Sequence, residues 1–192
     1  MLKSPPGETR PTQDKVRQAI FSGRGDFIVG ARVLELFAGS GALGLEAWSR
    51  GAAEVVWVES DRRALAVLKA NVQELCPDAG AQVRCVGADV FKFLEFSGRG
   101  LLAPRATPAV DQPAGQFDLV LADPPYDRAG EQGWLEKTLP ALEAGPILRP
   151  GGFLVFELAI HGRPVVRPGW ALIWERTYGG TRVLMYRRAE EM

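Results

Sequence analysis

From residue 33 onwards, the chain alternates short apolar runs with longer segments of helical spacing. The apolar runs have the length and composition of buried strands, and they cover residues 33–37, 55–58, 82–86, 117–122 and 153–158. Strands that alternate with helices form a parallel sheet with helices on both of its faces. Because both faces are covered, such strands are almost entirely apolar, as these are. The sequence therefore predicts an α/β fold around a mostly parallel sheet.

Apolar residues at helical spacing follow most of these runs. They predict one helix that ends before Gly51 and further helices over residues 61–75, 90–96 and 134–142. Asp61 is placed to act as the N-cap of the second helix. Residues 150–152 (Pro-Gly-Gly) predict a turn directly before the strand at 153–158. Two later runs, 170–177 and 182–187, flank a glycine-containing turn and resemble an antiparallel hairpin.

Composition narrows the class of protein further. A length of 192 residues suits one compact domain, and 46% apolar with 24% charged residues excludes wholesale disorder. The only cysteines are Cys76 and Cys85 and the only histidine is His161, which argues against a disulfide framework, a metal site or a Ser-His-Asp triad. No apolar run approaches the ~18 residues of a membrane span, and residues 1–17 contain no apolar signal segment. We expect a cytoplasmic protein without a membrane segment or a metal ion.

The charges are unevenly distributed along the chain although the formal net charge is zero. Residues 1–24 and 161–188 carry an excess of basic side chains, whereas residues 25–160 carry an excess of acidic ones. If the two ends fold together, they form a cationic face that attracts phosphates. The alternative is that these arginines and lysines are ordinary solvated surface.

A glycine-rich turn joins the first predicted strand to its helix. Gly39, Gly41 and Gly44 fit the spacing G-x-G-x-x-G, in the strand-to-helix context that gives this motif its meaning. Such a turn lets a ligand approach the backbone at the sheet edge where nucleotide cofactors bind, or it only packs the helix closely. Glu59 ends the second strand and could accept hydrogen bonds from a ribose diol, or cap a helix. Asp89 follows the third strand and could accept from an adenine amine, or cap the next helix.

Glu35 lies inside the first strand, four residues before Gly39. A carboxylate there is unfavourable beside a pyrophosphate but suits a cationic amino-acid tail; alternatively, it is a buried acid paired with the backbone or with a basic group. The pattern Glu35-x-Phe37-x-Gly39-x-Gly41 resembles motif I of the class I S-adenosylmethionine-dependent methyltransferases. The resemblance implies that Glu35 helps to hold the methionine portion of the cofactor, Glu59 the ribose and Asp89 the adenine. It implies further cofactor contacts at Phe37, Ala38, Gly39, Ser40, Gly41, Ser60, Val90 and Asp123.

The fourth strand runs directly into Asp123, Pro124, Pro125 and Tyr126. Two prolines make a rigid wall at the strand end, Asp123 supplies a hydrogen-bond acceptor and Tyr126 a flat stacking face. Such a group can grip a planar ring that carries an exocyclic amine; an ordinary exit loop is the alternative. The tetrapeptide resembles motif IV of the amino-methyltransferases, which act on adenine N6, guanine N2, cytosine N4 or a protein glutamine amide. The resemblance implies that these four residues are catalytic.

Residues 10–21 begin with Arg10, Pro11 and Thr12 and have an apolar face at Val16, Ile20 and Phe21, which predicts an amphipathic helix with Thr12 as a possible N-cap. Together with residues 35–47 and 123–126, this segment resembles the bacterial 16S ribosomal RNA guanine-N2 methyltransferase family, which methylates guanine 966.

The resemblance implies a Rossmann-like class I fold: a mostly parallel seven-stranded sheet with an antiparallel C-terminal hairpin. It implies a monomeric cytoplasmic enzyme that uses S-adenosylmethionine and acts on 16S rRNA in the 30S subunit or its precursor. Arg10, Thr12 and Tyr126 would lie near the target base. The chain then divides into a substrate-side extension, residues 1–24, and a methyltransferase domain, residues 25–192, with a surface insertion at 97–116.

Three other functions fit parts of the sequence. An adenine-N6 methyltransferase of DNA or RNA shares both motifs, but it generally carries a separate recognition domain. An NAD-type oxidoreductase would use the glycine-rich turn and leaves the Asp-Pro-Pro-Tyr tetrapeptide unexplained. A non-catalytic RNA-binding module could have kept only the fold.

Overall fold

The computed structural model describes residues 11–22, 27–96, 116–125 and 132–190, with the backbone alone at 11–15 and 22. Its helices and strands follow each other in the order α1 (Pro11–Ser22), β1 (Arg32–Leu36), α2 (Ala42–Ser49), β2 (Glu54–Glu59), α3 (Arg62–Leu75), η2 (Gly80–Gln82), β3 (Val83–Gly87), α4 (Val90–Phe96), β4 (Phe117–Ala122), α5 (Trp134–Glu143), β5 (Leu148–Ala159), β6 (Trp170–Tyr178) and β7 (Thr181–Arg188).

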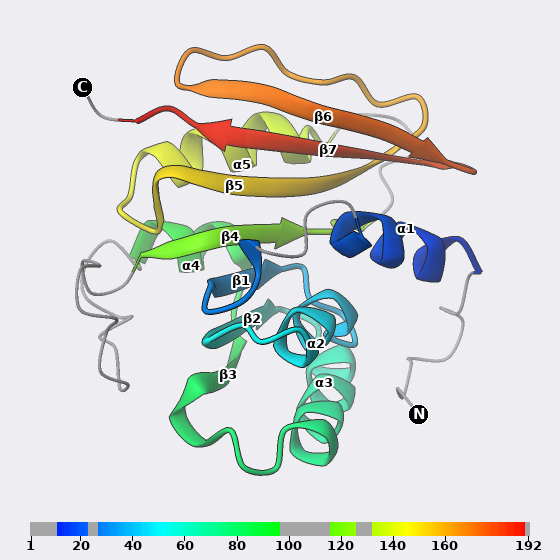
Figure 1. Ribbon diagram of the computed structural model, residues 1–192. Coiled ribbons are helices and arrows are strands. Elements are labelled where there is room, and N and C mark those ends of the chain that lie inside the picture. The colour runs from blue at the N-terminus through cyan, green and yellow to red at the C-terminus, as the bar shows by residue number, and fades with distance from the viewer. Residues whose placement is uncertain (1–10, 23–26, 97–115, 126–131, 191–192) are drawn as a thin grey trace.

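The strands form one seven-stranded sheet in the order β3-β2-β1-β4-β5-β7-β6 (Figure 1). The five strands β1 to β5 are parallel, and β7 pairs antiparallel with β5 and with β6. The strand order reverses between β1 and β4, which are direct neighbours with Leu36 opposite Ala122. Ligands of open α/β sheets bind beyond the carboxyl ends of the strands at such a reversal.

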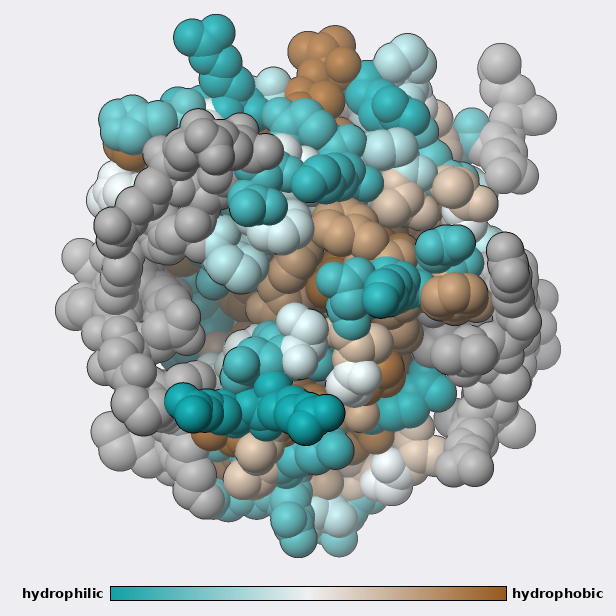
Figure 2. All heavy atoms as spheres, turned by 180° about the vertical axis from the view of Figure 1, so that it is seen from behind, coloured by the Kyte–Doolittle hydropathy of each residue, from teal (hydrophilic) through white to brown (hydrophobic). Residues whose placement is uncertain are grey.

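Helices cover both faces of the sheet, as Figure 1 shows. On one face, side chains of α1, α2 and α3, such as Ile20, Leu43 and Leu68, pack with strand residues into one apolar cluster. On the other face, α4 and α5 contribute Phe93 and Leu139 to a second cluster. Figure 2 views the molecule from the side opposite to Figure 1, where hydrophobic side chains gather near the centre among hydrophilic ones. The sheet is therefore buried on both faces, which explains its apolar strands.

Most predicted elements are confirmed. The α/β fold, the mostly parallel sheet of seven strands and the C-terminal hairpin are present. Helix α4 and strand β4 have the predicted bounds, and the Asp61 carboxylate accepts hydrogen bonds from the backbone N–H groups of Arg63 and Ala64 as an N-cap. Val16, Ile20 and Phe21 are buried on the inner face of α1.

Two local predictions were wrong. Thr12 is not the N-cap of α1, because the helix already begins at Pro11, whose missing N–H costs nothing in the first turn. Pro150, Gly151 and Gly152 do not form a turn ahead of β5 but lie inside it, as an irregularity between the pairs Phe117–Leu148 and Leu119–Phe153. A side chain at Gly152 would lie 2.6 Å from Leu148 Cδ1, so the bulge is packed tightly against its own strand.

The basic ends of the chain meet only in part. Helix α1 contacts β6, but the arginines of the C-terminal region that the structure describes are mostly engaged with other groups. Arg167 pairs with Glu143, and Arg182 pairs with Glu175. Arg188 donates to the backbone carbonyls of Leu142 at the end of α5 and of Gly145 after it. Lys3, Arg10 and Arg24 lie outside the described residues, so the cationic face stays a prediction. The predicted insertion at 97–116 lies outside them except for its last residue.

Neither a membrane span nor a metal cluster is found in the part of the chain that the structure describes. No helix there is long and apolar enough to cross a membrane. No group of three or more His, Cys, Asp or Glu side chains there is placed to hold a metal ion.

Candidate active site

The carboxyl ends of three neighbouring strands form the centre of the candidate site. Leu36 at the end of β1 is opposite Ala122 at the end of β4, and Ala122 is opposite Phe156 of β5. The glycine-rich turn after β1 and the Asp-Pro-Pro segment after β4 therefore leave the same edge of the sheet on adjacent strands. The predicted meeting of these two motifs is confirmed up to Pro125, and Tyr126 lies outside the described residues.

The turn after β1 needs backbone conformations that favour glycine. Gly39 and Gly41 have φ angles of 54° and 82°, and Phe37 has 56°, a conformation that L side chains rarely adopt. A Cβ at Gly41 would lie 2.4 Å from Leu68 Cδ1, whereas a Cβ at Gly39 would meet no atom within 4 Å. Gly41 is thus required by close packing, and Gly39 faces open space.

Glu59 holds the turn in place. Its carboxylate, at the end of β2, accepts hydrogen bonds from the backbone N–H of Gly39 at 2.8 Å and of Asp61 at 2.7 Å. The Ser40 carbonyl accepts from Asn71 Nδ2 at 3.0 Å. These N–H groups belong to loop residues and not to the first turn of a helix, so Glu59 stabilises the turn and does not cap a helix.

Asp89 caps helix α4, as its alternative interpretation predicted. Its Oδ1 accepts from the backbone N–H of Phe91 at 3.1 Å and of Lys92 at 3.0 Å. The Val90 side chain is buried in the second apolar cluster, so only its backbone is open to a ligand, while Ser60 is exposed.

Glu35 is a buried acid that caps the helix after the glycine-rich turn. Only 3% of the residue is exposed, and its Oε2 accepts from the N–H of Gly44 at 2.6 Å. Burial raises the pKa of Glu35 to about 8, although hydrogen bonds from the backbone of Gly44 and Leu43 oppose this rise. The N–H groups of Leu43 and Gly44 in the first turn of α2 are therefore already satisfied by a side chain and are not free for a phosphate.

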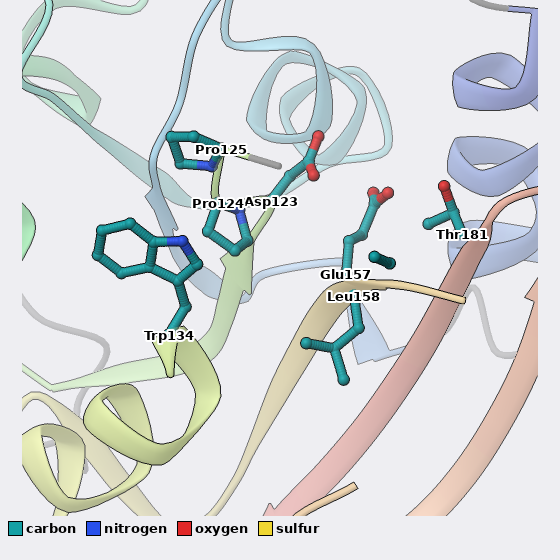
Figure 3. A pocket seen from close by; sticks show the side chains of 8 residues that line it. Asp123, Pro124, Pro125, Trp134, Glu157, Leu158 and Thr181 are labelled. Carbon is teal, nitrogen blue, oxygen red and sulfur yellow. The ribbon is translucent and has the colours of Figure 1, made fainter. Parts of the chain in front are cut away.

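A pocket that is partly open to solvent lies beside the Asp-Pro-Pro segment. Its wall comes from the residues after β4, the start of α5, the end of β5 and the start of β7, and it consists of Asp123, Pro124, Pro125, Trp134, Glu157, Leu158, Ala159 and Thr181. Figure 3 shows Glu157 between Asp123 and Thr181, with its carboxylate pointing in the same direction as that of Asp123. The pocket thus has an apolar side at the prolines and Trp134 and an acidic side at Asp123 and Glu157.

An aromatic cluster connects this pocket to the turn after β1. The rings of Phe91 and Trp134 are stacked with their centroids 5.9 Å apart and an interplanar angle of 6°. Phe37, at the strained position, contacts both rings from the edge, with its centroid 5.4 Å from that of Trp134. These contacts tie the turn after β1 to α4 and α5.

Sequence reasoning missed five members of the pocket wall: Trp134, Glu157, Leu158, Ala159 and Thr181. Trp134 was predicted only as the start of a helix, and Glu157 only as part of a buried strand. Glu157 carried a signal that was available: it is the one acid in the otherwise apolar run 153–158, as Glu35 is in 33–37. Arg10 and Tyr126 lie outside the described residues, and for Thr12 only the backbone is described.

The turn after β1 is poorly suited to a cofactor with a pyrophosphate. Glu35 occupies the N–H groups of Leu43 and Gly44 that a pyrophosphate would need. The open space at Gly39 leaves room for a ligand against the turn. Taken with the sheet order, these features define a class I S-adenosylmethionine-dependent methyltransferase.

Comparisons with known proteins identify the family. The sequence profile of the family described as "Conserved hypothetical protein 95" matches residues 1–187, and the chain belongs to this family. The Bacillus subtilis protein YlbH is 34% identical over 149 residues, which cover 78% of this chain and 71% of that protein. The ribosomal RNA small subunit methyltransferase D of Escherichia coli is 37% identical over 134 residues, which cover 70% of this chain and 56% of that enzyme. The solved structure of the Escherichia coli protein yhhF has a TM-score of 0.77 and 32% identity, over 99% of this chain and 92% of that one.

Proposed function

We propose that the chain transfers a methyl group from S-adenosylmethionine to the exocyclic N2 amine of a guanine in 16S ribosomal RNA. The observation that carries the proposal is the adjacency of β1 and β4, which sets the glycine-rich turn next to Asp123 and its pocket. The relative named ribosomal RNA small subunit methyltransferase D supports the RNA substrate. With ribosomal RNA as the substrate, the enzyme would work in the cytoplasm on the 30S subunit or its precursor. We propose that it acts as a monomer.

The turn after β1 would hold the cofactor. Gly39 offers open space, Glu59 lies beside it at the end of β2, and Glu35 places a carboxyl group beneath the turn. When bound, S-adenosylmethionine supplies an electrophilic methyl group on a positively charged sulfur. Asp89 keeps one oxygen, Oδ2, that no helical N–H group uses and that could accept from an adenine amine. Ser60 and the backbone of Phe37, Ala38, Ser40, Gly41 and Val90 complete the proposed contacts.

Asp123 would orient the target amine. The lone pair of an exocyclic amine is delocalised into the base, so the amine is a weak nucleophile. Asp123 accepts one amine hydrogen and favours a pyramidal nitrogen whose lone pair faces the donor, and positioning of this kind is the largest contribution available. The same carboxylate stabilises the positive charge that develops on the nitrogen. Pro124 and Pro125 form a rigid apolar wall, and Tyr126 would stack on a base that has left its helix.

Nucleoside analysis tests the assigned reaction. Isolated 30S particles from a strain that lacks this protein are incubated with it and with labelled S-adenosylmethionine. We expect N2-methylguanosine after digestion of the 16S RNA. Label in N6-methyladenosine would instead favour the adenine-specific alternative, and label in neither nucleoside would contradict the proposal. Binding of S-adenosylhomocysteine but not NADH, measured by calorimetry, separates the reaction from that of an oxidoreductase.

Substitution of Asp123 tests its role in transfer. We expect Asp123→Ala to lower kcat by at least ~100-fold, because the amine loses its acceptor, while calorimetry shows the affinity for S-adenosylhomocysteine changed less than ~3-fold. Asp78→Ala removes an exposed acid between α3 and η2 and serves as the control with unchanged activity. A loss of cofactor binding without a loss of kcat would assign Asp123 to the cofactor instead, and full activity of Asp123→Ala would point to a non-catalytic module.

A further inference from the structure

Glu157 is a buried acid that has no role in the proposed reaction as described so far. Only 8% of the residue is exposed, and it lines the pocket next to Asp123 (Figure 3). Unlike Glu35 and Glu59, it has no hydrogen-bond partner among the described residues. Burial of a polar group without a partner destabilises the folded state. A carboxyl group in this position suits a ligand that donates a hydrogen bond to it.

The surroundings of Glu157 make its ionised form still less favourable. Burial raises its pKa well above the usual range, and the negative charges of Asp123 and Glu35 raise it further. A hydrogen bond to the carboxylate acts in the opposite direction, because it stabilises the charged form. A donor delivered by the substrate would therefore interact strongly with this group.

The pocket geometry limits which hydrogen-bond donor of a ligand could reach Glu157. Asp123 follows Ala122 of β4, and Glu157 follows Phe156, the residue paired with Ala122 on the neighbouring strand. The two carboxyl groups thus leave equivalent positions of adjacent strands, which lie about 4.8 Å apart. Guanine carries two adjacent donors on its Watson–Crick edge, the N2 amine and N1–H. In adenine and cytosine, the ring nitrogen next to the amine is an acceptor.

We propose that Glu157 accepts the N1–H of the target guanine while Asp123 accepts from the N2 amine, so that Glu157 selects guanine. The inference rests on the proposed function and adds the residue that determines the base. A site built to bind an N–H group rejects analogues that lack it, because its own buried acceptor is then left unpaired. Flipped bases are commonly read through this edge.

The test compares two bases that share the reacting amine. 2,6-Diaminopurine keeps the N2 amine of guanine, but its N1 is an acceptor without hydrogen. Particles are assembled around 16S RNA that carries either guanine or 2,6-diaminopurine at the target position, and kcat/KM is measured on both. We expect the wild-type protein to prefer guanine by ~10- to 100-fold, the loss that follows from one charge-assisted hydrogen bond.

Glu157→Gln separates base selection from a structural role. The amide offers both a donor and an acceptor, so we expect a lower kcat/KM on guanine and a preference for guanine reduced at least ~10-fold. Glu157→Met, which has neither group, should lose the preference as well. Both variants should bind S-adenosylhomocysteine normally and unfold at or above the wild-type temperature, because an unpartnered buried carboxyl group has been removed. Thr181→Val, which lines the same pocket, is the control with an unchanged base preference.

The outcomes distinguish this inference from the proposed function. If both variants lose activity equally on the two substrates and keep the wild-type preference, Glu157 does not select the base and the inference is overturned. If the wild-type protein methylates neither particle, or labels another nucleoside, the proposed function itself fails. A wild-type protein without a preference between the two bases also overturns the inference and leaves the guanine-N2 reaction standing.

Discussion

Glutamates near the carboxyl ends of three parallel strands behave differently although they resemble each other in the sequence. Glu35 caps α2 through Gly44, Glu59 accepts two loop N–H groups, and Glu157 meets no donor among the described residues. A buried acid that accepts backbone N–H groups contributes to local structure, whereas one without a donor is available to a ligand. The difference between them is one of hydrogen-bond partners and not of burial alone.

The raised pKa of Glu35 predicts that the protein loses stability as the pH rises. The pKa is about 8 in the folded protein against 4.5 for an ordinary glutamate in the unfolded chain, so between these values the folded state holds a proton that the unfolded state has released. The contribution of Glu35 to the free energy of unfolding therefore falls with rising pH in this window, by at most about 1.4 kcal/mol per pH unit, and levels off above it. Glu157, whose pKa is also raised by burial, adds to the slope in the same direction. Urea unfolding at a series of pH values between about 5 and 9 measures this slope.

Glu35→Gln measures how much of the pH dependence of the free energy of unfolding comes from Glu35. The amide keeps an oxygen for the N–H of Gly44 and cannot ionise, so we expect a flatter dependence on pH. Glu95→Gln, an exposed acid at the end of α4, is the matched control and should keep the wild-type slope. Equal slopes in Glu35→Gln and the wild-type protein would show that Glu35 titrates normally.

Residues with a local signal were identified from the sequence, and residues placed by long-range pairing were not. Glu59 and Asp61 stand at the boundaries of regular patterns, and Glu35 interrupts an apolar run, so the positions of all three could be predicted. The proximity of Glu157 to Asp123 depends on the pairing of β5 with β4, which no local pattern specifies. Trp134 reaches the pocket for the same reason.

Among the elements, the turn between β1 and α2 is the most constrained. Gly44 lies in α2, yet a Cβ there would approach Trp57 Nε1 to 2.4 Å and Glu35 Oε2 to 2.7 Å. The helix therefore packs on β2 through a position without a side chain. Gly39 differs, because its constraint is the backbone angle and the space above it is open.

Alanine substitutions separate these two constraints. We expect Gly44→Ala to lower the free energy of unfolding by about 1–3 kcal/mol through overpacking, despite the better helix propensity of alanine. Gly39→Ala should cost only about 1 kcal/mol of backbone strain but weaken S-adenosylhomocysteine binding by at least ~10-fold, because the methyl group points into the open space. Urea unfolding and calorimetry on the same samples measure both effects. Weaker binding in neither variant would contradict a ligand at Gly39.

Element bounds were predicted well where caps and apolar runs coincide, as at α4 and β4. They were predicted poorly at β5, where Pro150 and two glycines are typical of a turn. Tertiary contacts override that preference: Arg149 pairs with Asp118 of β4 at 2.6 Å and keeps the segment in the sheet. At α1, proline in the first turn outweighed the preference of threonine for the N-cap.

At the scale of the whole molecule, Arg188 ties the last strand to the connection between α5 and β5. Its guanidinium donates to the carbonyl oxygens of Leu142, Gly145 and Leu148. We expect Arg188→Met to lower the free energy of unfolding by about 1–3 kcal/mol, because partly buried carbonyls lose their donor. Arg163→Met, at an exposed position, should change it by less than about 0.5 kcal/mol in the same denaturant titration. Equal effects of the two substitutions would show that the hydrogen bonds of Arg188 make no specific contribution to stability.

Strand β7 lies between β5 and β6 although it follows both in the chain, and it brings Thr181 to the pocket wall. During synthesis, β6 can therefore reach its place in the sheet only after the later strand has left the ribosomal exit tunnel. A nascent chain that stops before residue 181 holds both sequence motifs of the site and still lacks a closed pocket. Completion of the binding site therefore waits for the synthesis of β7.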